Sequence, residues 1–92
     1  MSHDYVKSEL SFKVGTGTDL EALNKMIEEE TKQTSHVMDS LPIEILVNAI
    51  AADSVEIKVL VWCQSIYTES AFKSELMSRL LKRFIEKEIK IV

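Results

Sequence analysis

A regular alternation of apolar side chains marks residues 54–63 as a β-strand. One face of this strand is apolar throughout, and the other begins with charged residues and ends in Leu60 and Trp62. The first face carries Val55, Ile57, Val59 and Val61. Because a strand that is apolar on both faces lies inside a sheet and is covered on both sides, we expect 54–63 to be the central strand.

Three further segments show the same alternation and predict three more strands. The first is 9–16 and the second is 43–51. Only Ala52 and Asp53 separate the second segment from the central strand, so these two strands should form an antiparallel hairpin. Residues 89–92 alternate over a shorter length and predict a last strand.

Helical spacing appears in two places. Thr18 and Glu21 have the Thr-x-x-Glu spacing of a capping box, so the first helix should begin with Thr18 as its cap and run to about Gln33. The second helix is predicted over 69–87. Its apolar residues cover more than half of its circumference, wider than the ~100° stripe that packs on one sheet, so we expect a second contact surface on this helix. These residues are Phe72, Leu76, Met77, Leu80, Leu81, Phe84 and Ile85.

The order of elements is strand, helix, strand, strand, helix, strand. With right-handed crossovers, this order predicts an α+β ferredoxin-like βαββαβ sandwich: a four-stranded antiparallel sheet in the order 4-1-3-2 with both helices on one face. The 92-residue chain is long enough for one such domain, over 9–92, preceded by an N-terminal tail over 1–8. Because the chain stops within a strand, we expect it to be a fragment of a larger protein.

The sheet face that the two helices leave open is expected to carry several large apolar side chains. Burying two or three of them elsewhere would recover ~1.5–3 kcal/mol each, which favours a partner surface. The alternative is an ordinary scatter of exposed apolar side chains. The candidate interface consists of Leu46, Ile50, Leu60 and Trp62.

Charge and composition exclude several classes of protein. The net charge of −4 argues against a general nucleic-acid or anionic-membrane binder, because such proteins need an excess of Lys and Arg. The charge is uneven: residues 1–65 carry a net charge of −6 and residues 66–92 a net charge of +2. The single cysteine, Cys63, cannot form an internal disulfide, and no apolar run approaches the ~20 residues of a membrane span.

No candidate catalytic, cofactor or metal site can be read in the chain. The acidic run 28–30 lies on a helix, where successive side chains diverge and cannot converge on one ion. His36 has no second ligand at metal-binding spacing. The Gly15-Thr16-Gly17 turn lacks the Lys-Ser/Thr of a phosphate loop, and the acidic residues after it would repel an anion. We therefore predict no enzyme and no cofactor.

Three stretches taken together resemble the C-terminal cytoplasmic α/β domain of the small-conductance mechanosensitive channel (MscS-like) family. They are Val14-Gly15 leading to Thr18-Asp19-Leu20-Glu21, the strand Val59-Leu60-Val61-Trp62, and the run from Glu75-Leu76 through Phe84-Ile85 to Glu88-Ile89-Lys90-Ile91. Their order and spacing match the family's pattern over about residues 9–92.

The resemblance implies that the intact protein is a bacterial inner-membrane channel, heptameric, that releases ions and small osmolytes under membrane tension. The present chain would line the cytoplasmic vestibule, with other subunits and the preceding β domain of the same chain as partners, and without nucleic acid. A second hypothesis is a ligand- or metal-sensing cytoplasmic domain of a transporter with the same fold, which would need clustered His or carboxylate ligands.

Overall fold

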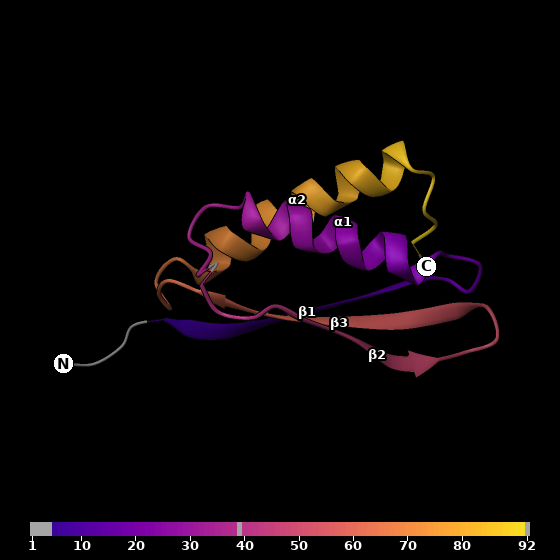
Figure 1. Ribbon diagram of the computed structural model, residues 1–92, viewed down its shortest axis with the longest axis horizontal. Helices are drawn as coiled ribbons and strands as arrows, with labels where there is room; N and C mark the ends of the chain where they lie inside the picture. Colours follow the sequence, from indigo (N-terminus) through magenta and orange to yellow (C-terminus); the bar gives the residue numbers. More distant parts are fainter. Residues whose placement is uncertain (1–4, 39, 92) are drawn as a thin grey trace.

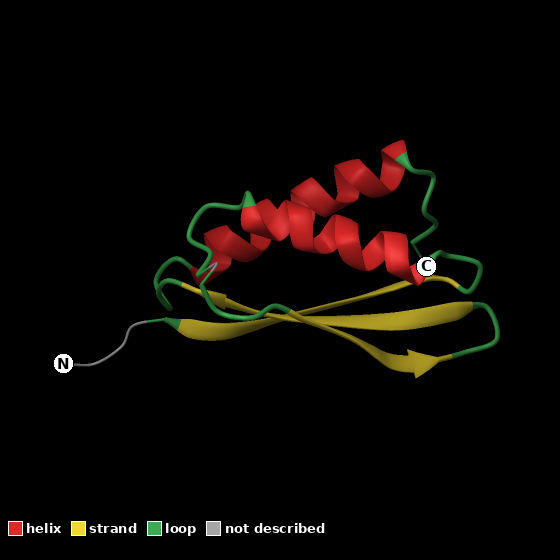
Figure 2. Ribbon diagram, in the orientation of Figure 1, coloured by secondary structure: helices red, strands yellow, loops and turns green. Residues whose placement is uncertain are grey.

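The computed structural model describes residues 5–38 and 40–91, which form two layers. A three-stranded sheet forms one layer, and two helices lie side by side on one of its faces (Figures 1 and 2). Neither helix in these residues has the length and apolarity that a membrane span requires. The elements are β1 (Val6–Gly15), α1 (Leu20–Lys32), β2 (Glu44–Ile50), β3 (Ser54–Cys63) and α2 (Glu69–Glu86).

The sheet has the strand order β1-β3-β2, and both pairings are antiparallel. The central strand and its bounds are therefore as predicted. The predicted hairpin is also confirmed, because Ala51 N–H donates to the carbonyl of Ser54 at 2.8 Å and closes the turn between β2 and β3. The sequence indicated this arrangement because β3 is apolar along one whole face and ends in Leu60 and Trp62 on the other.

The core lies between the helix layer and the faces of β1 and β3 that point toward it. All four valine and isoleucine residues predicted on the first face of β3 are buried. Phe72, Leu76, Leu80 and Phe84 of α2 recur every four residues and are almost completely buried against them. Leu23, Met26 and Ile27 contribute the buried stripe of α1. The helical and strand periodicities thus predicted the core correctly.

The fourth strand of the predicted sheet is absent from the described residues. Its place beside β1 is taken by a single bridge between Ile91 and Val14 and by one hydrogen bond, from Gly15 N–H to the Lys90 carbonyl at 3.0 Å. The reason is the end of α2, where Ile89 N–H turns back to the carbonyl of Phe84 and cannot join a ladder. Val92, the last residue of the predicted strand, lies outside the described residues.

Two predictions near the N-terminus also need correction. Residues 1–4 of the predicted tail lie outside the described residues, but Val6–Ser8 belong to β1, which starts three residues before the predicted position. The cap of α1 is Asp19 and not Thr18: its carboxylate accepts hydrogen bonds from Glu21 and Ala22 N–H. A carboxylate is as good a cap as a hydroxyl, and here it also occupies the N–H groups that an anion would need.

The connector after α1 extends the sheet at the end of β3. His36 adopts a positive φ of 70°, which turns the chain after the helix. Its carbonyl accepts a hydrogen bond from Gln64 N–H at 2.7 Å, and Met38 N–H donates to the carbonyl of Trp62 at 2.8 Å. Val37 forms a bridge with Cys63. The last residues of β3 are therefore paired on both sides, although β2 itself reaches only as far as Leu60.

Candidate functional site

Trp62, Leu60 and Leu46 lie on the sheet face opposite the helices, as predicted. Trp62 pairs with Lys7 of β1, and Leu60 pairs with Glu44 of β2. Leu46 pairs with Lys58, so it is a diagonal neighbour of Leu60 on the same face. We call Leu46, Leu60 and Trp62 the outer apolar patch. Trp62 and Leu60 are half-buried and Leu46 is exposed. Both helices lie on the opposite face of the sheet (Figure 1).

Charged and aromatic side chains surround the outer apolar patch. Tyr5 contacts the Trp62 ring edge to face at 5.5 Å between centroids, and the Lys7 ammonium lies 5.9 Å from the same ring. Lys7 also forms an ion pair with Glu44 at 3.0 Å, across the central strand. A polar rim around an apolar centre is the usual composition of a protein interface. Sequence reasoning missed this rim because it depends on the register of three strands.

The prediction that Ile50 belongs to this face is wrong. A β-bulge at Asn48 shifts the register of β2, so that Ala49 pairs with Glu56 and Ile50 pairs with Val55. Paired residues share a face, and Val55 points toward the helix layer. The extra residue therefore moves Ile50 to the helix side of the sheet, where it is 76% exposed. Alternation alone could not reveal this, because a bulge reverses the face of every residue after it.

A second exposed apolar surface lies along α2. Met77, Leu81 and Ile85 recur every four residues and are exposed, in agreement with the prediction that this helix is apolar beyond the stripe that its own sheet covers. Between α2 and the end of β1 lies a small apolar groove of about 230 Å³. Its lining consists of Phe12, Met77, Ser78, Leu80, Leu81, Phe84 and Ile91. The groove occupies the side of the sandwich where the fourth strand was expected.

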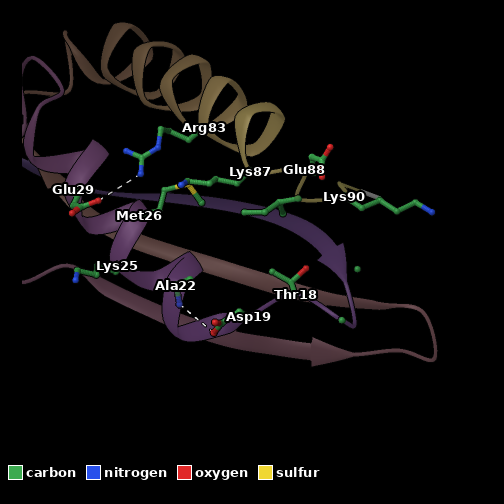
Figure 3. Close-up of a pocket in the computed structure, with 13 residues that line it drawn as sticks. Thr18, Asp19, Ala22, Lys25, Met26, Glu29, Arg83, Lys87, Glu88 and Lys90 are labelled. Carbon is green, nitrogen blue, oxygen red and sulfur yellow. Dashed lines mark hydrogen bonds and ion pairs between the residues drawn. The ribbon is translucent and has the colours of Figure 1, made fainter.

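A larger hollow than this groove, of about 670 Å³, is an open cleft between the start of α1 and the end of α2 (Figure 3). Both acidic and basic side chains line this cleft. The Arg83 guanidinium forms an ion pair with Glu29 at 3.7 Å, and the Asp19 carboxylate accepts the hydrogen bond that caps α1. Among the residues that line the cleft, none is a histidine or a cysteine. Its lining therefore offers neither an imidazole nor a thiol for acid–base or nucleophilic chemistry.

Ion pairs join the two helices beside this cleft. Glu30 is only 15% exposed and receives Arg83 at 2.6 Å and Arg79 at 3.6 Å. Arg79 also pairs with Glu75 on its own helix at 3.2 Å. The Ser35 backbone N–H, which donates to the Glu75 carboxylate, and then Arg79 lower the pKa of Glu75. These contacts hold α1 and α2 together and do not prepare an acid or base for catalysis.

The buried polar groups near the end of β3 form a local hydrogen-bond chain. Ser8 is fully buried and donates to Glu69 Oε2 at 2.8 Å, and its Oγ lies 3.6 Å from Cys63 Sγ. No histidine takes part in these contacts among the described residues, and these residues contain no group of three or more His, Cys, Asp or Glu arranged for a metal ion. The chain thus links β1, β3 and the first turn of α2.

Comparison with known proteins agrees with this geometry. The family model described as "Mechanosensitive ion channel MscS, C-terminal" matches residues 8–91. The fold is similar to that of a crystal structure of Helicobacter pylori MscS in a closed state, with a TM-score of 0.82 and 22% sequence identity over 97% of this chain. The chain spans 35% of the length of that channel. The comparison with curated proteins gave no match. The chain belongs to the MscS family of mechanosensitive ion channels, which are not enzymes, and corresponds to their C-terminal domain.

Proposed function

We propose that this domain is the cytoplasmic vestibule and assembly module of a channel that releases ions and small osmolytes under membrane tension. Its partners are other subunits of a homo-oligomer, a heptamer by family resemblance, and the β domain that precedes it in the channel chain. The intact channel lies in a bacterial inner membrane with this domain on the cytoplasmic side. The domain itself forms neither pore nor gate.

The outer apolar patch is the observation that carries this proposal. In a monomer, a tryptophan and two leucines on the sheet face that the helices leave open add no stability, because nothing buries them there. Trp is among the side chains most enriched at the energetic centres of protein interfaces, and a polar rim such as the Lys7–Glu44 ion pair beside it is the composition expected there. An assembly built from repeated copies of this domain needs an interface such as the outer apolar patch on every copy.

The test replaces Trp62 with Glu in the intact channel and measures the mass of the detergent-extracted oligomer. A buried central aromatic contributes about 2 kcal/mol or more to an interface, so the change should weaken subunit association by roughly 30-fold. The same cells should survive osmotic downshock less well. Thr16→Glu adds the same charge in an exposed turn away from the patch and serves as the control. An unchanged oligomer mass for Trp62→Glu would contradict the assembly role.

A further inference from the structure

We propose that the open cleft between α1 and α2 binds a small organic acid, with the carboxylate on Lys87 beside Arg83 and the hydrocarbon part on the apolar floor of the cleft. The inference goes beyond the proposed function, because the cleft lies on the helix side of the sheet, away from the outer apolar patch (Figure 3). Its volume of about 670 Å³ is within the usual range for pockets that take small molecules.

The charged side chains that line the cleft include more unpaired cations than unpaired anions. The acidic ones are Asp19, Glu29 and Glu88. The Asp19 carboxylate caps α1, and the Glu29 carboxylate pairs with Arg83, so only Glu88 has no partner among the described residues. By contrast, none of the three lining lysines has an ammonium group that forms a hydrogen bond or ion pair with another described residue. These lysines are Lys25, Lys87 and Lys90. The cleft therefore attracts an anion, although the whole chain is acidic.

Lys87 is the cation best placed to bind that anion. Arg83 lies in the last turn of α2 and Lys87 is the C-cap, so the spacing of four residues puts them on one side of the helix. Figure 3 shows Lys87 extended across the cleft, whereas Lys25 and Lys90 point away from it. Two carboxylates of α1 already hold the Arg83 guanidinium in place. The Lys87 ammonium has its donors free, so it supplies the charge-assisted hydrogen bonds to the ligand.

The floor of the cleft is apolar and selects the kind of anion. Met26 of α1 is almost completely buried there, and Ala22 and Ile89 complete the apolar part of the lining. A hydrocarbon chain that lies on these side chains is removed from water. Because carboxylates line the same cleft, a phosphate group with two charges is repelled more strongly than a carboxylate with one. This combination favours a monocarboxylic acid with a short hydrocarbon chain.

The proposed site is separate from the N-terminus of α1, where acidic residues were expected to repel an anion. There the Asp19 carboxylate already accepts hydrogen bonds from Glu21 and Ala22 N–H. The ligand lies instead at the end of α2 and is held by side chains. The dipole of α2 also favours a cation at this end, so the experiment has to separate that structural role of Lys87 from ligand binding.

The experiment titrates the isotope-labelled 92-residue chain with hexanoate at constant ionic strength and follows amide chemical shifts by NMR. The chain has two glycines, Gly15 and Gly17, and both line the cleft, so their well-separated amide signals report on it directly. We expect both signals to shift and saturate with a Kd on the order of 10 mM, the affinity that a ligand of about eight non-hydrogen atoms reaches. Acetate has the charge without the chain, and hexanol has the chain without the charge. Each should bind at least about fivefold more weakly than hexanoate.

Two lysine substitutions in and beside α2 provide the matched comparison. Lys87→Gln removes the cation that lines the cleft, and Lys82→Gln removes the same charge from an exposed position outside the lining. Lys87→Gln should weaken hexanoate binding at least about fivefold, whereas Lys82→Gln should change it by less than about twofold. Both side chains are exposed, so both variants should unfold close to the parent.

Four results would overturn the inference. They are no saturable shift at Gly15 and Gly17, hexanol binding as tight as hexanoate binding, an equal loss in both lysine variants, and a lower Tm of Lys87→Gln with hexanoate binding retained. The last result would show that Lys87 serves only the end of α2. None of these measurements involves Trp62, so the assembly role is tested independently.

Discussion

Replacing two adjacent residues of β3 by alanine tests whether the outer face of the sheet is open. Val59 is fully buried on the helix side, and Leu60, the next residue, is half-buried on the outer face. Both substitutions leave the strand and its hydrogen bonds in place. The structure predicts a large loss of stability for Val59→Ala and a small loss for Leu60→Ala, although the leucine loses more atoms.

The magnitudes follow from burial. Val59→Ala removes two methyl groups at about 0.8 kcal/mol each and leaves a cavity that adds about 1 kcal/mol, so the free energy of unfolding should fall by about 2.5 kcal/mol. For a domain of this size, that corresponds to a fall in Tm of roughly 10–20 °C. Leu60→Ala leaves no closed cavity, and its cost should be about 1 kcal/mol or less.

Urea denaturation of the 92-residue chain, followed by tryptophan fluorescence and circular dichroism, measures both changes. Equal m-values would show that the two variants expose the same surface on unfolding, so that the midpoints compare stability directly. If Leu60→Ala costs as much as Val59→Ala in the isolated chain, the outer face is already covered by this chain. The argument for a partner on that face would then fail.

Three further substitutions test individual contacts. Glu88, which adopts a positive φ of 56° after α2, should give a protein more stable by about 0.5 kcal/mol when replaced by Gly, measured as a higher urea midpoint. Arg83→Met removes the 2.6 Å ion pair with a mostly buried carboxylate and should cost about 1–2 kcal/mol by the same measurement. The pKa of Glu75 is lowered in the folded state, so its ionised carboxylate stabilises the fold at pH values above the ordinary pKa of glutamate. This stabilisation is lost as the pH falls from about 5 to 3. The Tm difference between the parent and Glu75→Gln should therefore narrow over that range, and a constant difference would contradict this account.

The sequence was sufficient for the features that depend on periodicity. The alternation in β3 identified the central strand and both of its faces, and the four-residue spacing in α2 identified its buried stripe. The short link at Ala52 and Asp53 was sufficient for the hairpin. In each case the pattern determines which face of the element is packed in the core, since the apolar face must be buried.

The features that sequence reasoning missed depend on the backbone conformation at one or two residues or on the register of the strands. The extra residue at Asn48 reversed the face of Ile50, and nothing in an apolar-rich strand marks such a bulge. After the turn that follows α2, Ile91 forms a single bridge to β1 within the described part of the chain, where a strand was expected. The ion pair between Lys7 and Glu44 joins residues far apart in the sequence, so it became visible only with the three-stranded register.

The double pairing at the end of β3 has a consequence for how a partner binds Trp62. With Lys7 opposite it on one side and Met38 donating to its carbonyl on the other, the backbone of this residue is already immobilised in the free domain. Tyr5 further restricts the rotamers of the indole. Docking onto this anchor therefore loses little conformational entropy, a term that otherwise costs about 0.5–1.5 kcal/mol for each ordered side chain. The contact is preorganised, and even a modest buried area around it can hold two rigid bodies in a fixed orientation.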